Sequence, residues 1–484
     1  MKKIKILTAM ILAVLTCFVS VFVVGCGNNN KIEVNTTGEL KKDENGNVIF
    51  EDVTIKLATV VAGTDVYVFN DIIKRFNLEY DGKIQVIAES TAQGLFEKTI
   101  GQNISQNNNS PDFIMSHEKH HKNFLSKGLI QPIDDVMETS GIKINFDNYA
   151  QGLAKYRTLG SSDGKTYSVP ADAQSMVVVY NKKLLNEIGC SVPTNRAELL
   201  DVCSKFKAKY SDKYPIAWID NELKENFYEY SFASAVLQNG GTLINAEGRA
   251  DWYDNETNRA AFTNAIKAYR EIYDAGYAKR NTAKATALER FNNGNCLFYV
   301  TSPWDIRNII AQVAEDKKIS ENVVMDEYVG GTSISGWFAM GDNASKPYAD
   351  YIYGDSHFFA MVSRVSDINK KAAILEFIKW FNESGNASKQ WAKAGHITAY
   401  TGVSAQDDYV NDKFISTYIS KFYPDMNDFM CLPMTNVASE VVSNMVSLCA
   451  KTIVLASGYT DKTDGQAIKS TQDAVNTATD FFIK

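Results

Sequence analysis

Cysteine is scarce in this chain of 484 residues, which contains seven cysteines and no CxxC pair. Cys17 and Cys26 lie near the amino terminus, so five remain, an odd number. An odd set without close pairs argues against a disulfide framework and against a zinc cage. We expect these cysteines to be mostly buried as small apolar side chains, and we expect neither a cofactor nor a bound metal.

A surplus of basic residues is also missing, because 57 Asp and Glu outnumber 50 Lys and Arg and give a net charge of −7. This balance disfavours nucleic acid as a partner. The sequence has no P-loop, GxGxxG or GxSxG motif, so three common enzyme classes have no support. A composition of 45% hydrophobic and 22% charged residues is that of a globular chain, and its length exceeds one ordinary core.

The first 25 residues are typical of an export signal. Three lysines precede an almost unbroken apolar run over 6–24, as in secretory signals. The run ends in VVGC at 23–26 and is followed by the polar GNNN at 27–30. This ending resembles a bacterial lipobox, which implies cleavage before Cys26, lipid attachment to its sulfur and a location on the extracytoplasmic face of the cell membrane. An uncleaved membrane anchor is the alternative.

From residue 53 onward the apolar periodicity switches repeatedly between two and 3.6, after a polar stretch over 27–47 that is typical of a flexible tether. The first series predicts strands at 53–57, 83–88 and 113–115, with helices at 66–76 and 93–105. The later apolar runs predict strands at 176–180, 215–218, 296–300 and 357–362. Strand-helix-strand order favours parallel sheets, which bind ligands beyond the carboxyl ends of their strands.

Four blocks of the sequence together resemble family 1 of the bacterial extracellular solute-binding proteins, which serve ABC importers and include the maltose-binding type. They occur in the family's order between about 53 and 400. They are PD at 111–112 with GLI at 128–130, GKTYSVPAD at 164–172 running into VVYNKKLL at 178–185, FNNG at 291–294 leading to SPW at 302–304, and ILEFIKW at 374–380 leading to WAKAG at 391–395.

The resemblance implies an α/β fold of two lobes (type II periplasmic-binding-protein-like), each a parallel-rich sheet flanked by helices, with hinge crossings between the lobes. Ligand is trapped by hinge closure in such folds. The expected organisation is a signal peptide at 1–25, a lipidated tether at 26–52, an N-lobe at 53–171 plus 357–405 and a C-lobe at 175–352 plus 406–484. The chain departs from the family at 355–359, where DSHFF replaces a commoner Gly-Gly-Trp-type run.

The strongest rival signal is HEKHH at 117–121, which formally matches the HExxH motif of zinc proteases. That chemistry needs both histidines on one established helix, and a third ligand. The upstream sequence PDFIM at 111–115 reads as a strand, so His117 would lie at a strand end. His117 is therefore either a ligand-binding residue or part of a solvated basic surface, and an exported zinc hydrolase remains an alternative.

A binder of neutral polar solutes needs aromatic faces and a few groups that fix hydroxyls. Trp304 matches the family's Gly-Pro-Trp-type position, and Trp218 follows an apolar run; either ring could instead belong to the core. Asp172 lies at the first crossing, where its carboxylate could accept two hydroxyls. The remaining candidates are Asp65 and Gln93 at strand-to-helix turns, which could instead be helix caps, and His357 at the second crossing.

The sequence therefore predicts a monomeric substrate-binding lipoprotein, not an enzyme. It would capture a mono- or oligosaccharide in an interlobe cleft and deliver it to the transmembrane subunits of an ABC permease. A binding protein for a non-sugar solute, such as a peptide, a polyamine or a metal, is a further alternative. Several aromatic residues in the cleft would favour sugar, and a clustered excess of carboxylates would favour polyamine.

Overall fold

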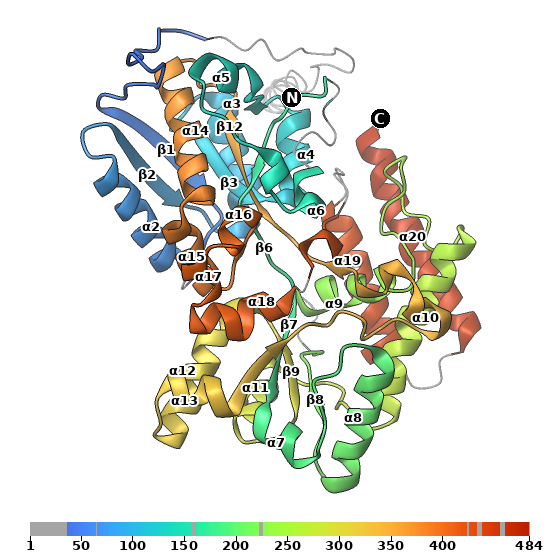
Figure 1. The fold of residues 1–484 in the computed structure, drawn as a ribbon. Coiled ribbons are helices and arrows are strands. Elements are labelled where there is room, and N and C mark those ends of the chain that lie inside the picture. The colour runs from blue at the N-terminus through green and yellow to red at the C-terminus, as the bar shows by residue number, and fades with distance from the viewer. Residues whose placement is uncertain are drawn as a thin grey trace, which may run out of the picture. The chain divides into compact units, whose positions relative to one another are not determined.

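Strands from distant parts of the chain form two sheets, one above the other in Figure 1. The computed structural model describes residues 36–63, 65–155, 161, 163–221, 226–423, 425–432, 438–454 and 460–483, and those from 36 onward belong to one unit. The signal peptide and Cys26 lie outside the described residues. None of the described helices is long and apolar enough to cross a membrane.

The first sheet has the strand order β2-β1-β3-β12-β4, and β5 pairs with β12. Its strands are β1 (Val53–Thr59), β2 (Ile84–Ser90), β3 (Phe113–His117), β4 (Ile130–Gln131), β5 (Val169–Pro170) and β12 (His357–Val362). β1 runs parallel to β2 and β3, as the sequence predicts. β12 joins the same sheet antiparallel to β3, so a strand from late in the chain completes the first lobe.

Helices cover this sheet, including those that the sequence pattern predicts at 66–76 and 93–105. They are α2 (Asp65–Glu79), α3 (Gln93–Gln106), α4 (Glu118–Ser126), α5 (Asp134–Ser140), α14 (Ile368–Glu383) and α15 (Gly385–Lys393). On α2, Phe69, Ile73 and Phe76 are buried at helical spacing. The Phe76 ring meets Phe377 of α14 edge-on at 5.0 Å between centroids, which joins the two helices in one core.

The second sheet has the order β10-β7-β9-β8 and is largely antiparallel. Its strands are β7 (Val177–Asn181), β8 (Ile216–Ala217), β9 (Phe298–Thr301) and β10 (Val329–Thr332). Only β8 and β9 pair in parallel within it. The prediction of a parallel-rich sheet thus fits the first lobe better than the second.

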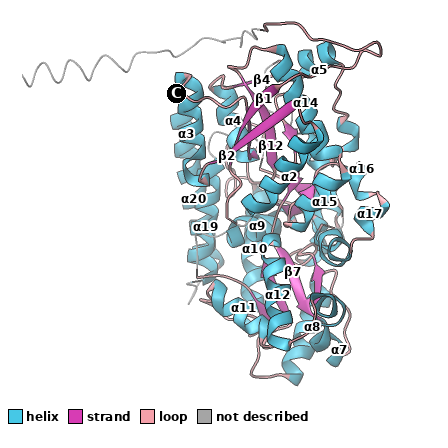
Figure 2. Cartoon of the chain, turned by 90° about the vertical axis from the view of Figure 1, so that its left-hand side faces the viewer, coloured by secondary structure: helices cyan, strands magenta, loops and turns pink. Residues whose placement is uncertain are grey.

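Helices from the middle and the end of the chain surround the second sheet. They are α7 (Lys182–Glu187), α8 (Arg196–Lys209), α9 (Asn226–Leu237), α10 (Glu256–Asp274), α11 (Lys284–Asn292), α12 (Ile306–Lys317), α19 (Ala438–Cys449) and α20 (Asp461–Ile483). The last two pack against each other and against α9 and α10 (Figure 2). The carboxyl-terminal helices therefore belong with the second sheet, although the exact lobe boundaries stay predictions.

Short strands carry the chain between the sheets. β6 (Asp172–Ala173) follows β5 and lies between the two sheets in Figure 1. It pairs with β13 (Ile397–Thr398), and Gln174 forms a bridge with Asp355 just before β12. Gly354 is required at this crossing, because a Cβ there would lie 2.4 Å from the Gln174 carbonyl oxygen. Both crossings thus meet at one place, beside the ends of β3 and β12.

Part of the segment 26–52, which is expected to be a tether, contacts the first lobe. Within it, Thr37 bonds through its backbone to Ser366 and Ile368, and Lys42 donates to the carbonyl oxygen of Thr139 at 2.8 Å. Residues 36–52 therefore lie on the first lobe. Their polar composition suggested a tether because the bonds that hold them use backbone groups and long polar side chains, which leave no apolar pattern.

Four of the five cysteines beyond Cys26 are buried and Cys190 is half-buried, and none of the five forms a disulfide within the described part of the chain. Burial raises the pKa of the Cys203 and Cys296 thiols, so these groups are uncharged at neutral pH and pack as apolar side chains. The expectation for the cysteines is confirmed in this respect.

Candidate functional site

A cavity of about 280 Å³ lies where the crossings meet the strand ends. Its walls come from the loop 60–63 after β1, from the starts of α2 and β12, from the segment 391–396 and from the turn after β9. Tyr230 of α9 and Trp304 reach it from the C-lobe side. The volume is near the lower end of the roughly 300–1,000 Å³ typical of small-molecule sites, which suits a small solute better than a long chain.

Close backbone contact between the two lobes shapes one edge of the cavity. Trp304 lies in η3 (Pro303–Asp305), directly after β9. Gly395 has φ +102°, and a Cβ there would lie 2.6 Å from the backbone of Pro303 and Trp304. A side chain at 395 would therefore push the segments apart. This contact brings the half-buried Trp304 ring to 6.5 Å from His396, in near-parallel orientation.

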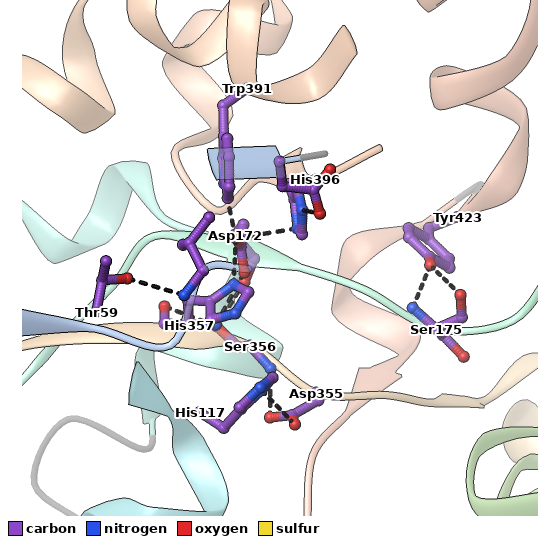
Figure 3. A network of polar contacts seen from close by, with 12 residues as sticks. Thr59, His117, Asp172, Ser175, Asp355, Ser356, His357, Trp391, His396 and Tyr423 are labelled. Carbon is purple, nitrogen blue, oxygen red and sulfur yellow. Dashed lines mark hydrogen bonds and ion pairs between the residues drawn. The ribbon is translucent and has the colours of Figure 1, made fainter. Parts of the chain in front are cut away.

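Asp172 and His357 form a buried ion pair behind the cavity wall (Figure 3). Asp172 is fully buried and accepts the backbone N–H of His357 at 2.8 Å and the indole N–H of Trp391 at 2.7 Å. Its Oδ2 lies 2.8 Å from His357 Nδ1. Burial opposes charge on both groups, but their attraction prevails: the pKa of Asp172 is lowered and that of His357 is raised.

His396 lies between two carboxylates and is 3% exposed. Its Nε2 is 3.2 Å from Oδ2 of Asp65, and its Nδ1 is 3.5 Å from Oδ2 of Asp172. The imidazole stacks on Trp391 with ring centroids 4.0 Å apart and an angle of 7°. The ring is therefore held on its face by an indole and on its edges by two acids.

His117 ends β3 and lies 2.8 Å, Nδ1 to Oδ2, from Asp355 of the second crossing. Lys119 lies 3.8 Å from the same carboxylate and 3.6 Å from Glu229 of α9. Desolvation lowers the pKa of His117 to about 4, although Asp355 opposes the shift. His117 is thus neutral at neutral pH, and it presents a ring with a fixed partner to the cavity.

The HEKHH segment does not have the geometry of a zinc protease. His117 is the last residue of β3 and Glu118 is the first residue of α4, so the two histidines do not share a helix. His121 is buried, with its ring 6.4 Å from Phe358. Within the described ranges, the group of three side chains that could hold a metal contains neither Glu118 nor His121.

Four of the predicted ligand-binding residues line one cavity, namely Asp65, His117, Trp304 and His357. Asp172 lies behind them and is bonded to His357 and Trp391, so it positions His357. Gln93 begins α3, but its side chain lies outside the described part of the structure. These assignments to ligand contact stay predictions.

The prediction for Trp218 is corrected. Its side chain is 1% exposed and packs against Tyr269, Tyr273 and Phe338, with ring centroids 5.1 to 6.4 Å apart. It follows β8 as Trp304 follows β9, but its ring points into the C-lobe core. Trp252 and Trp337, which the sequence leaves unplaced, are also fully buried.

Sequence reasoning missed four polar or aromatic residues of the lining: Gln174, Tyr230, Trp391 and His396. Trp391 falls in a helical pattern that predicts a core residue. It is 1% exposed, yet its ring supports His396 at the cavity. The family-like WAKAG block at 391–395 could have pointed to Trp391 and to His396, which follows it directly. Nothing in the local pattern of α9 distinguishes Tyr230.

A larger open groove of about 690 Å³ lies between α2 and β2. It is lined by Asn70, Lys74, Asn77, Asp81 and Lys83, among others, on the outer edge of the first sheet. Its residues come from adjoining elements of one lobe. The interlobe cavity is the better candidate, because buried titratable groups and aromatic rings from both lobes converge on it.

Comparison with known proteins agrees with this geometry. A model of the bacterial extracellular solute-binding protein family matches residues 71–417. The maltotriose-binding protein of Pyrococcus abyssi (strain GE5 / Orsay) is 24% identical over 315 residues, which are 63% of this chain. The matched segment covers 58% of the Pyrococcus protein, which is less than two thirds of its length.

Two solved structures are similar in fold. The sugar-binding protein MalE from Xanthomonas citri matches with a TM-score of 0.70 and 16% identity, over 89% of this chain and 100% of its own. The GacH receptor of Streptomyces glaucescens, solved unliganded and with acarbose, matches with a TM-score of 0.65 and 16% identity, over 88% of this chain and 98% of its own. The predicted two-lobed fold of maltose-binding type is confirmed.

Proposed function

Because this chain belongs to the bacterial extracellular solute-binding protein family, we propose that it captures a small neutral sugar in the interlobe cavity and delivers it to an ABC permease. At the level of the family it is a binding protein with an extracytoplasmic location. The observation that carries the proposal is the cavity itself, where Trp304 and Tyr230 of one lobe face Asp65, His117 and His357 of the other.

The chemistry of the lining favours a neutral polar solute. Aromatic rings pack on the C–H faces of a sugar, while oriented donors and acceptors fix its hydroxyls. Each carboxylate near the cavity is matched by a histidine: Asp65 by His396, Asp172 by His357 and Asp355 by His117. A polyamine would need carboxylate oxygens that are free to bind its ammonium groups, whereas each of these carboxylates already lies within 3.2 Å of an imidazole nitrogen, so this pairing argues against the polyamine alternative.

The size of the site and the relatives point the same way. About 280 Å³ admits a mono- or disaccharide, and the relatives include a maltotriose-binding protein and a sugar-binding MalE. Attachment through lipidated Cys26, a monomeric state and delivery to permease subunits complete the proposal. The sequence at 6–26 supports the anchor, and the family supports delivery to a permease.

A thermal-shift screen of the purified mature protein tests the solute class. Mono- and disaccharides, polyamines and short peptides are compared at equal concentration, and hits are titrated calorimetrically. A sugar at 100 times its dissociation constant adds about 2.7 kcal/mol of stability and should raise the melting temperature. A shift with polyamines or peptides, and with none of the sugars, would refute the assignment to sugar.

A further inference from the structure

We propose that Asp172, His357 and His396 form a site for one divalent transition-metal ion of the zinc class in the wall of the cavity. One ligand atom from each residue, a carboxylate oxygen and two imidazole nitrogens, lies within 4.8 Å of the other two. The three residues come from β6, from the start of β12 and from the turn before β13, and all three are buried. Their meeting is thus a product of the fold.

The distances are close to those of a tetrahedral site. Zinc–nitrogen and zinc–oxygen bonds of roughly 2.0–2.2 Å place neighbouring ligand atoms about 3.3–3.5 Å apart. His396 Nδ1 already lies 3.5 Å from Asp172 Oδ2. His357 Nδ1 lies 2.8 Å from the same oxygen, the spacing of a hydrogen bond. Replacing that proton by a metal ion requires a displacement of less than about 1 Å.

The state of His396 is the second, independent observation. Among the described residues its buried Nδ1 has no hydrogen-bond partner, while Nε2 faces Asp65 at 3.2 Å. A neutral imidazole has one proton. If that proton is donated to Asp65, the lone pair of Nδ1 points at the Asp172 carboxylate, which also carries lone pairs. A cation between these two lone-pair groups would bind both of them.

The surroundings match those of metal-binding histidines. Such histidines usually direct their other ring nitrogen to a carboxylate, which fixes the tautomer and the orientation. Asp65 has this role for His396, and the indole N–H of Trp391 holds Asp172 from behind. Trp391 also fixes the His396 ring by stacking. Two imidazoles and one carboxylate suit zinc and its neighbours better than calcium or magnesium.

Three protein ligands leave a fourth position for water or for a solute oxygen. Because His357 and His396 line the cavity, a hydroxyl of the captured solute would be the natural occupant of that position. The metal site does not depend on the proposed sugar, since it is tested with the metal alone.

The test is a titration of chelator-treated mature protein with Co²⁺ and Zn²⁺ at neutral pH. We expect one saturable site per chain, a visible Co²⁺ spectrum typical of tetrahedral coordination, and displacement of Co²⁺ by Zn²⁺. His396→Gln should weaken binding at least tenfold. Asp65→Asn, at a more exposed position, should weaken it about 10–100-fold. The control is His120→Gln, because His120 pairs with Glu97 outside the cluster; this variant should bind as the wild type does.

Three outcomes would overturn the site. The first is wild-type protein that binds no stoichiometric Co²⁺ or Zn²⁺, which decides the question even if a variant fails to fold. The second is binding that His120→Gln removes and His396→Gln retains, which would assign the metal to the protein surface. The third is a His396 that nuclear magnetic resonance shows to be doubly protonated in the presence of excess Zn²⁺. Sugar binding measured on the same samples separates failure of this site from failure of the proposed function.

Discussion

Two tryptophans that follow neighbouring strands should respond in opposite ways to truncation. Trp304 is half-buried and faces the cavity, whereas Trp218 is 1% exposed within an aromatic cluster. Trp304→Ala should weaken sugar binding by at least about 2 kcal/mol, or roughly thirtyfold, if the ring is a central contact. Trp218→Ala should leave a cavity in the core and cost about 3–5 kcal/mol of folding stability.

The assay pairs two measurements on both variants and the wild type. Calorimetric titration uses the sugar that gives the largest thermal shift, and urea unfolding gives the stability. We expect Trp304→Ala to lose affinity with a much smaller loss of stability, and Trp218→Ala to show the reverse wherever it stays folded. Near-normal affinity combined with a strongly weakened fold in Trp304→Ala would refute the placement of this ring against the solute.

The remaining predictions concern the lipid anchor, the HEKHH segment and the loss of folding stability at low pH. Cys26→Ala should release the protein from membranes or leave it unprocessed, and mass spectrometry of an unmodified wild-type Cys26 would contradict the anchor. Glu118→Gln should change stability little, because burial raises the pKa of Glu118 well above its ordinary value and so favours the uncharged acid that Gln resembles; zinc-dependent peptide cleavage lost in this variant would contradict a pure binder. Partial burial alone would raise the pKa of Asp412, but Lys393 and backbone N–H groups have the larger effect and bring it below its ordinary value. The contribution of Asp412 to stability is therefore lost as the pH falls through its folded-state pKa. The stability difference between wild type and Asp412→Asn should therefore be largest near pH 6 and should vanish in strong acid, and a difference independent of pH would contradict this.

Much of the fold could be predicted because apolar periodicity is a local property. The pattern at 53–57 and 66–76 corresponds to β1 and α2, and the buried run at 357–362 is β12. Which sheet a strand joins is not a local property. β12 is inserted antiparallel beside β3, and only the family resemblance placed it in the N-lobe. The mixed second sheet was missed for the same reason.

The site was less predictable than the fold. Asp65, His117, Trp304 and His357 could be proposed because each lies at the end or the start of a strand or helix, where α/β sheets keep their ligands. The same rule failed for Trp218, since a strand end does not determine which way the next side chain points. His396 precedes β13, a strand of two residues that is recognised by its pairing with β6. So short a strand has no apolar periodicity, and the sequence pattern therefore did not identify His396.

The pairing of acids with histidines connects the burial of these groups to the choice of solute. An isolated buried carboxylate would be protonated or strongly destabilising. Burial raises the pKa of Asp172, but the charge and the hydrogen bonds of His357 outweigh it and leave the pKa lowered. The Asp172 charge thus interacts with groups of the protein and orients the His357 imidazole. What reaches the cavity is a ring nitrogen with a fixed partner, which suits a hydroxyl better than a free charge. In the proposed function, the aromatic rings Tyr230 and Trp304 on the opposite lobe would then complete a site that discriminates by shape and by hydrogen bonding.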